Sequence, residues 1–240
     1  MTDEEYLKYL TEWLNGDLWH EVHELLQQTH VFRSWNEILG MACEESRRPG
    51  VFHRWVVHNY LDSIASAVRR LSDRDERTTS LTRFLDEVAS GAHRLTHDWW
   101  MSGARSWERE QREERFAELG RGNDHVDPGL ALEDKERVEQ ASAKVKAYVD
   151  TYVAHLDADR AERVVIPTFG DAHSAVQVIY QVYHQWFQNI TRQALVPVRP
   201  PRWEHVLTVP WITPDQATEI AENQQQAWKQ DMIDLGIAKE

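Results

Sequence analysis

The sequence predicts an all-α protein, because helix-start signals, helix-breaking residues and apolar residues at helical spacing recur along most of its 240 residues. The clearest helix is expected over 51–71, where one apolar stripe runs through Val57, Leu61, Ile64, Val68 and Leu71. Pro49-Gly50 stands directly before it and forces a turn. No apolar run approaches the roughly 20 residues that a membrane-spanning helix needs.

The N-terminal region is predicted to contain three helices before this turn. Thr2 and Glu5 form a capping-box pattern that begins the first helix. Its apolar positions are Tyr6, Leu10, Trp13 and Leu14. Asn15-Gly16 predicts a break or a kink, and further helices are expected over 17–28 and 32–46.

The rest of the chain is also mainly helical. Thr79 and Ser80 can cap a helix that reaches about Val88, a short helical segment lies around 97–101, and the highly charged residues 104–118 predict a solvated helix. The loop 120–129 is the predicted boundary between a helical bundle over 1–119 and a helical C-terminal part over 130–240.

In that C-terminal part, helices are expected over 132–156 and 171–195, and from Thr213-Pro214 onward. The segments 163–168 and 205–211 are short, β-branched and interrupted by proline. They are predicted to be extended and are candidates for pairing as a small two-stranded ribbon packed on the bundle.

Composition predicts a soluble, cytoplasmic protein. The formal net charge of −13 opposes nonspecific binding to nucleic acid or to an anionic membrane, and no membrane partner is expected. The single cysteine, Cys43, fits a reducing compartment, and the acidic start MTDEEYLKYL differs from a signal peptide. The eleven tryptophans favour a wide bundle core, with base stacking as the alternative.

One polar face of the predicted 51–71 helix suggests chemistry. At 100° per residue, Arg54, His58 and Asp62 fall together with Arg69, beside the apolar stripe that holds His53. Such an arginine–histidine–carboxylate cluster can hold a phosphate and move protons. The alternative is a structural set of ion pairs between residues four apart. Arg70 and Asp73 are predicted to form a structural pair at the helix end.

Histidine spacing raises the question of a metal. His20 and His23 are three residues apart, His93 and His97 are four apart, and both spacings allow one metal to be shared. His97-Asp98 also begins a signature of helical metal phosphohydrolases. The sequence marks no third ligand, so neither a metal nor another cofactor is predicted. The chain also lacks a phosphate-binding glycine loop, a GxSxG motif and a zinc-type cysteine pair, which excludes nucleotide-hydrolase and serine-hydrolase classes.

The segments RRLSD at 69–73 and TTSLTRFL at 78–85 resemble the HEPN helical superfamily, and in particular its abortive-infection (AbiU-like) branch. PTFGD at 167–171 and the Pro-Trp at 210–211 continue the resemblance. The resemblance implies a homodimer. It also implies a metal-independent ribonuclease motif, in which four to six residues separate an arginine from the histidine that follows it. Arg48, or Arg47, with His53 has this spacing.

The resemblance implies an endoribonuclease of phage defence or of a toxin–antitoxin pair, with RNA as substrate and a cognate antitoxin or regulator as a further partner. In that chemistry a neutral histidine deprotonates a ribose 2′-hydroxyl and the arginine stabilises charge on the phosphate. Two alternatives remain open. One is a noncatalytic HEPN interaction or regulatory module, and the other is a metal-dependent helical phosphohydrolase.

Overall fold

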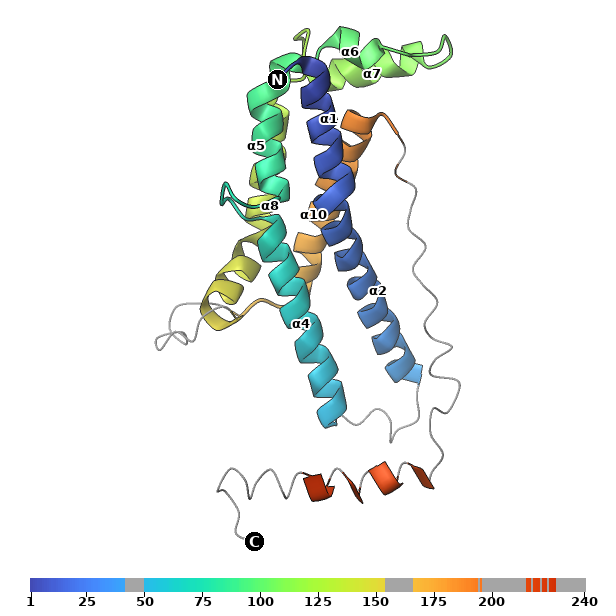
Figure 1. The fold of residues 1–240 in the computed structure, drawn as a ribbon, viewed down its shortest axis with the longest axis vertical. Helices are drawn as coiled ribbons and strands as arrows, with labels where there is room; N and C mark the ends of the chain where they lie inside the picture. Colours follow the sequence, from blue (N-terminus) through green and yellow to red (C-terminus); the bar gives the residue numbers. More distant parts are fainter. Residues whose placement is uncertain are drawn as a thin grey trace. The chain divides into compact units, whose positions relative to one another are not determined.

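The computed structural model describes residues 1–41, 50–153, 166–193 and 195, together with 215–216, 218–220, 222–223 and 225–227 (Figure 1). The chain divides into two compact units, residues 1–200 and 201–240. In the second unit the described residues are helical and exposed. The all-α prediction is confirmed, since the described part holds helices and one isolated bridge between Thr96 and His125. None of its helices is both long and apolar enough to cross a membrane.

The first unit begins with α1 (Asp3–Trp13), a π-helical turn (Leu14–Leu18) and α2 (Trp19–Met41). The predicted capping box is present, with the Thr2 and Glu5 side chains each accepting a main-chain N–H of the other residue. The predicted kink falls at Gly16, whose ψ of −116° is not helical.

The prediction of two helices over 17–28 and 32–46 is wrong within the described range, because α2 runs unbroken to Met41. The residues between the two predicted helices contain neither proline nor glycine. The hydroxyl of Thr29 donates to the carbonyl oxygen of Leu25 at 2.8 Å, so the polar side chain is satisfied inside the helix. Residues 42–46 lie outside the described residues.

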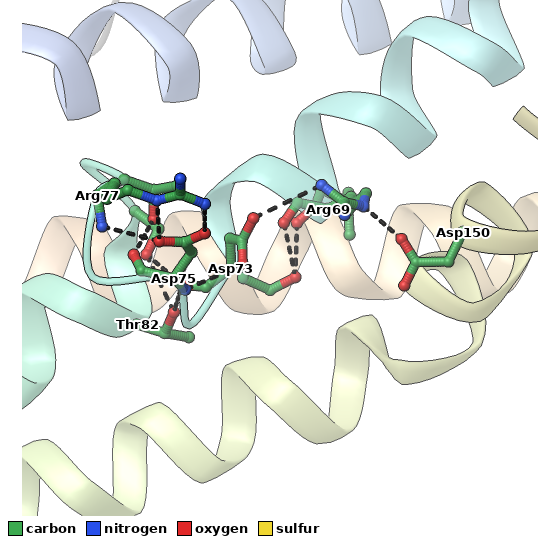
Figure 2. Close-up of polar contacts among 10 residues, drawn as sticks. Arg69, Asp73, Asp75, Arg77, Thr82 and Asp150 are labelled. Atoms are coloured by element: carbon green, nitrogen blue, oxygen red, sulfur yellow. Dashed lines mark hydrogen bonds and ion pairs between the residues drawn. The ribbon is translucent and has the colours of Figure 1, made fainter. Parts of the chain in front are cut away.

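Helix α4 spans Val51–Leu71, as predicted, and α5 spans Leu81–Gly91 with Ser80 as its N-cap. Short helices follow at Ala92–Arg94, at α6 (His97–Met101) and at α7 (Arg109–Gly120). The link between α4 and α5 is fixed at Asp73, whose carbonyl oxygen accepts from the hydroxyls of Ser80 and Thr82 (Figure 2).

Helix α8 (Pro128–Tyr148) starts four residues before the predicted Leu132, because Asp127 caps it and Pro128 takes the first helical position. A π-helical turn (Val149–Val153) extends it. Helix α10 (Phe169–Thr191) starts at a capping box formed by Thr168 and Asp171. It ends at Thr191, with Arg192 as its C-cap, rather than at the predicted residue 195. Of the predicted extended segments, 163–165 and 205–211 lie outside the described residues, and 166–168 form neither helix nor strand.

The core of the first unit lies between α10, α8, α4, α2 and α1. Helix α8 packs along α5 and α4, while α10 packs against α8, α4 and α2. Elements on both sides of the 120–129 loop therefore contribute to one buried cluster. Its largest fully buried side chains include Trp186, Tyr183, Tyr6 and Phe84. Of the tryptophans, Trp186 and Trp100 are buried, whereas Trp55 and Trp107 are exposed.

Candidate functional site

A groove of about 640 Å³ lies where α2, α4 and the start of α10 meet. Helix α2 contributes Phe32, Arg33, Asn36 and Glu37, α4 contributes His53 and Val57, and α10 contributes Phe169 and His173. The volume is within the range of about 300–1,000 Å³ that is typical of small-molecule sites. The groove therefore combines one apolar wall with a few polar and charged side chains.

Stacked aromatic rings form the apolar wall of the groove. The ring of Phe32 lies parallel to that of Tyr60 with centroids 3.8 Å apart, and the ring of Phe169 stacks on Phe32 at 5.5 Å. Phe32 and Tyr60 are buried, whereas Phe169 is 40 % exposed. An exposed aromatic face backed by buried rings is a rigid surface on which a planar ligand can stack.

His53 reaches the groove from the first turn of α4. The side chain is half-buried, and its Nδ1 is enclosed by the protein without a hydrogen-bond partner among the described residues. An unsatisfied buried nitrogen is uncommon in folded proteins, and a ligand that binds there is one way to satisfy it. A neutral imidazole can accept a proton at one nitrogen and donate at the other.

His173 reaches the same groove from α10. Its Nε2 shares a hydrogen bond of 2.8 Å with the hydroxyl of Tyr60. Burial, and then the positive charge of Arg33, lower the pKa of His173 below its ordinary value. His173 is therefore neutral near pH 7. The positive charge of the exposed Arg33 stands at the groove and can attract a phosphate.

The other residues that the sequence suggested are placed differently. Arg48 and Arg47 lie outside the described residues. Arg54, His58 and Asp62 are exposed on α4, and none of the three lines the groove. The structure thus brings His53 together with Arg33 and His173, two residues that the sequence analysis did not select. His173 is 120 positions from His53, and no local pattern connects them.

The polar stripe of α4 continues at Arg69, which has a structural role (Figure 2). Its Nε donates to Oδ1 of Asp150 at 2.5 Å, and its Nη1 lies 3.5 Å from the carboxylate of Asp73. Arg70 and Asp73, which were predicted to pair at the helix end, are joined by a main-chain hydrogen bond, in which the N–H of Asp73 donates to the carbonyl oxygen of Arg70 at 3.3 Å. The guanidinium of Arg70 instead donates to Glu21 of α2 at 2.7 Å. These contacts connect α4 to its neighbours and leave no free guanidinium in this part of the stripe.

Three of the four closely spaced histidines have polar side chains beside them. His20 lies 3.4 Å from Glu24, His23 shares a hydrogen bond with Gln27, and Nε2 of His97 lies 2.8 Å from Glu113. In the part of the chain that the structure describes, no three histidine, cysteine or carboxylate side chains come together as a possible metal site.

Comparison with known proteins gives one match. A family model described as HEPN AbiU2 matches residues 7–190, a span that contains every residue lining the groove. Neither the curated proteins nor the solved structures contain a match.

Proposed function

This chain belongs to the HEPN AbiU2 family of abortive-infection proteins, and on that premise we propose that it cleaves RNA without a metal ion. The observation that carries the proposal is the position of His53, a half-buried histidine that lines the groove together with the exposed Arg33. An imidazole can move the protons of metal-independent phosphodiester cleavage, and a guanidinium can stabilise the charge that grows on the phosphate.

In the proposed reaction, RNA supplies its own nucleophile. His53 takes the proton of a ribose 2′-hydroxyl, and the 2′-oxygen attacks the adjacent phosphorus. The bond from phosphorus to the 5′-oxygen breaks, and a 2′,3′-cyclic phosphate forms. The leaving oxygen takes a proton from water, and the resulting hydroxide takes the proton held by His53, which returns to its neutral form. Arg33, with Arg48 as the family resemblance implies, stabilises the negative charge that grows on the phosphate oxygens.

The aromatic wall gives the substrate a place to bind. Phe169 is exposed above Phe32, and stacking of one base on such a ring contributes about 1–3 kcal/mol. This contribution depends little on sequence, because each base has a flat face. It also requires no broad basic surface, which agrees with a net charge of −13. We therefore expect single-stranded RNA to be the substrate.

A second copy of the chain is the proposed partner, and it would cover the start of α4. Val51, Phe52 and Trp55 are exposed there, at 76 %, 62 % and 60 %, and the rings of Phe52 and Trp55 stack on each other. Exposed apolar groups clustered beside a candidate catalytic residue favour an interface. A cognate antitoxin or regulator that covers the same surface would keep the enzyme inactive.

The test is cleavage of a short single-stranded RNA by the purified protein, with and without EDTA. Wild type is expected to yield 2′,3′-cyclic phosphate ends in both conditions. The His53→Ala and Arg48→Ala variants are expected to lose activity, and His53→Ala by at least about 100-fold. His93→Ala is the matched control, because His93 is exposed and lies outside the groove.

Full activity of His53→Ala would refute the proposed role of His53. Intact RNA with every variant, together with normal growth of cells that express wild type, would favour a noncatalytic HEPN module instead. Cleavage that EDTA abolishes would favour a metal-dependent phosphohydrolase.

A further inference from the structure

A second cleft, of about 410 Å³, is lined by residues of α6, of α7 and of the end of α10. Three arginines line it, Arg112 and Arg115 from α7 and Arg192 from the residue that ends α10. The remaining lining residues are Trp100, Asn189 and three glutamines, and none of the lining side chains is acidic. Three guanidinium groups around one cavity are unusual in a chain with a net charge of −13.

Main-chain carbonyl groups hold two of these arginines in place. Nη1 of Arg192 donates to the carbonyl oxygens of Trp99 at 3.0 Å and Ser102 at 2.8 Å. Nη1 of Arg112 donates to the carbonyl oxygen of Trp100 at 3.1 Å. Carbonyl oxygens position a guanidinium without neutralising its charge, so these contacts orient Arg192 and leave it a full cation.

The carboxylates nearby do not balance the charge of the cleft. Arg112 lies 3.2 Å from Glu108, and Arg115 lies 2.7 Å from Glu118. No ion pair of Arg192 occurs among the described residues. Burial, and then the positive charge of Arg112, lower the pKa of Arg192 from its ordinary value. Like charges repel, so two guanidinium groups that line one cleft disfavour each other. An anion between them would relieve this repulsion.

A buried amide in the same cleft also has no partner. Asn189 is 3 % exposed and lines the cavity. Its Oδ1 accepts from Nη2 of Arg115 at 3.2 Å, while its Nδ2 has no hydrogen-bond partner within the described part of the chain. Because a guanidinium has only donors, Arg115 faces the amide oxygen of Asn189, and the amide nitrogen points away from Arg115. A buried donor is thus left for an acceptor group.

We propose that this cleft binds the phosphate group of a nucleotide or of an RNA strand. Guanidinium forks match phosphate oxygens in geometry, and the unpaired amide of Asn189 adds a neutral donor. The volume of about 410 Å³ is within the range of small-molecule sites.

The phosphate site is separate from the groove at His53. Asn189 lies sixteen residues after the groove residue His173 on the straight run of α10, which corresponds to about 24 Å at 1.5 Å per residue. Binding in this cleft therefore does not depend on the ribonuclease proposal. A variant that loses phosphate binding can keep an intact groove, and the reverse also holds.

The experiment is calorimetric titration of the full-length protein with inorganic phosphate, AMP, and a short oligouridine carrying either a 5′-phosphate or a 5′-hydroxyl. Wild type is expected to bind at least one phosphate-bearing probe, and to bind it more weakly as salt rises. Arg192→Gln and Arg115→Gln are each expected to weaken this binding at least about tenfold, through loss of a charge-assisted contact. Arg192→Lys is expected to restore part of it.

The matched control is Arg121→Gln. Arg121 and Arg192 each directly follow a helix and have a left-handed backbone conformation, and replacing either one with glutamine changes the net charge by the same amount. Arg121 does not line the cleft, and it pairs with Glu133. Arg121→Gln is expected to bind like wild type, and circular dichroism checks that each variant is folded. If the 5′-phosphorylated oligouridine binds more tightly than AMP, the site recognises the phosphate at an RNA end. If the two probes bind equally well, the site recognises a free nucleotide. Absence of binding by wild type, or equal weakening by Arg121→Gln, would overturn the proposal.

Discussion

Replacement of Asp134 is expected to weaken the contact between α8 and α10 and so to lower the stability of the fold. Asp134 of α8 is 5 % exposed, and its Oδ2 accepts from Nε1 of the fully buried Trp186 of α10 at 2.9 Å. Gln185 also donates to Oδ2, at 3.2 Å, and Arg137 donates to Oδ1 at 2.6 Å. One carboxylate therefore satisfies donors from both helices.

The magnitude follows from these partners. Asp134→Ala leaves Nε1 of Trp186 buried without an acceptor, which costs about 1–3 kcal/mol. Loss of the pair with Arg137, whose side chain is 50 % exposed, costs less than about 1 kcal/mol. We expect a total loss of about 3 kcal/mol in the free energy of unfolding. Asp134→Asn keeps an oxygen that can accept from Trp186, and we expect a loss of about 1 kcal/mol.

The assay is urea unfolding at pH 7, followed by fluorescence, with thermal melting as a second measure. A loss of 3 kcal/mol corresponds to a decrease of about 6–12 °C in Tm for a protein of this size. In a Trp186→Phe background the donor is gone, so Asp134→Ala is expected to cost at least about 1 kcal/mol less. Asp124→Ala is the control, because that side chain is 96 % exposed. Equal losses for Asp134→Ala and Asp134→Asn, with no coupling to Trp186, would refute the reasoning.

Three further predictions concern packing and pH. A Cβ atom on Gly91 would lie 2.2 Å from the hydroxyl of the buried Tyr6, so Gly91→Ala is expected to lower the free energy of unfolding by about 1–3 kcal/mol, and urea unfolding would measure this. Hydrogen bonds from Lys144, and then from Thr168, lower the pKa of Asp171 from 3.8 to about 2, so this stabilisation is full above pH 3.8 and is lost as pH falls toward 2. The Tm of wild type should therefore exceed that of Asp171→Asn at pH 7, and a gap that persists at pH 2 would contradict this. Because the pKa of His173 is lowered from 6.5, wild type should lose stability relative to His173→Gln as pH falls below 6.5, and melting curves between pH 7.5 and 5 would check the sign.

Local signals predicted some helices accurately. Helix α4 has the predicted bounds, because Pro49-Gly50 and the stripe through Ile64 and Val68 are properties of adjacent residues. The loop at 120–129 was also predicted, but not the start of α8 at Pro128, although Asp127 and Pro128 form a standard cap. The false break in α2 came from polar residues that an unbroken helix accommodates.

The candidate site was only partly predictable. The family motif identified His53, and the groove contains it, but Arg33 and His173 carried no signal that distinguished them from other arginines and histidines. The same applies to Asn189, which in sequence is one amide among many. Its environment depends on where Arg115 of α7 lies relative to the end of α10.

The sequence by itself determined the helical class, the bounds of α4, the cap of α5 and the membership of the HEPN AbiU2 family. These features depend on residues within one or two helical turns, or on a pattern spread along the chain, and both can be read without a structure. Only the tertiary structure decided which polar groups meet. Arg69 reaches Asp150 across 81 positions, and Trp186 reaches Asp134 across 52. The physical reason is that such contacts require helix packing, and packing places side chains from distant segments within hydrogen-bond distance.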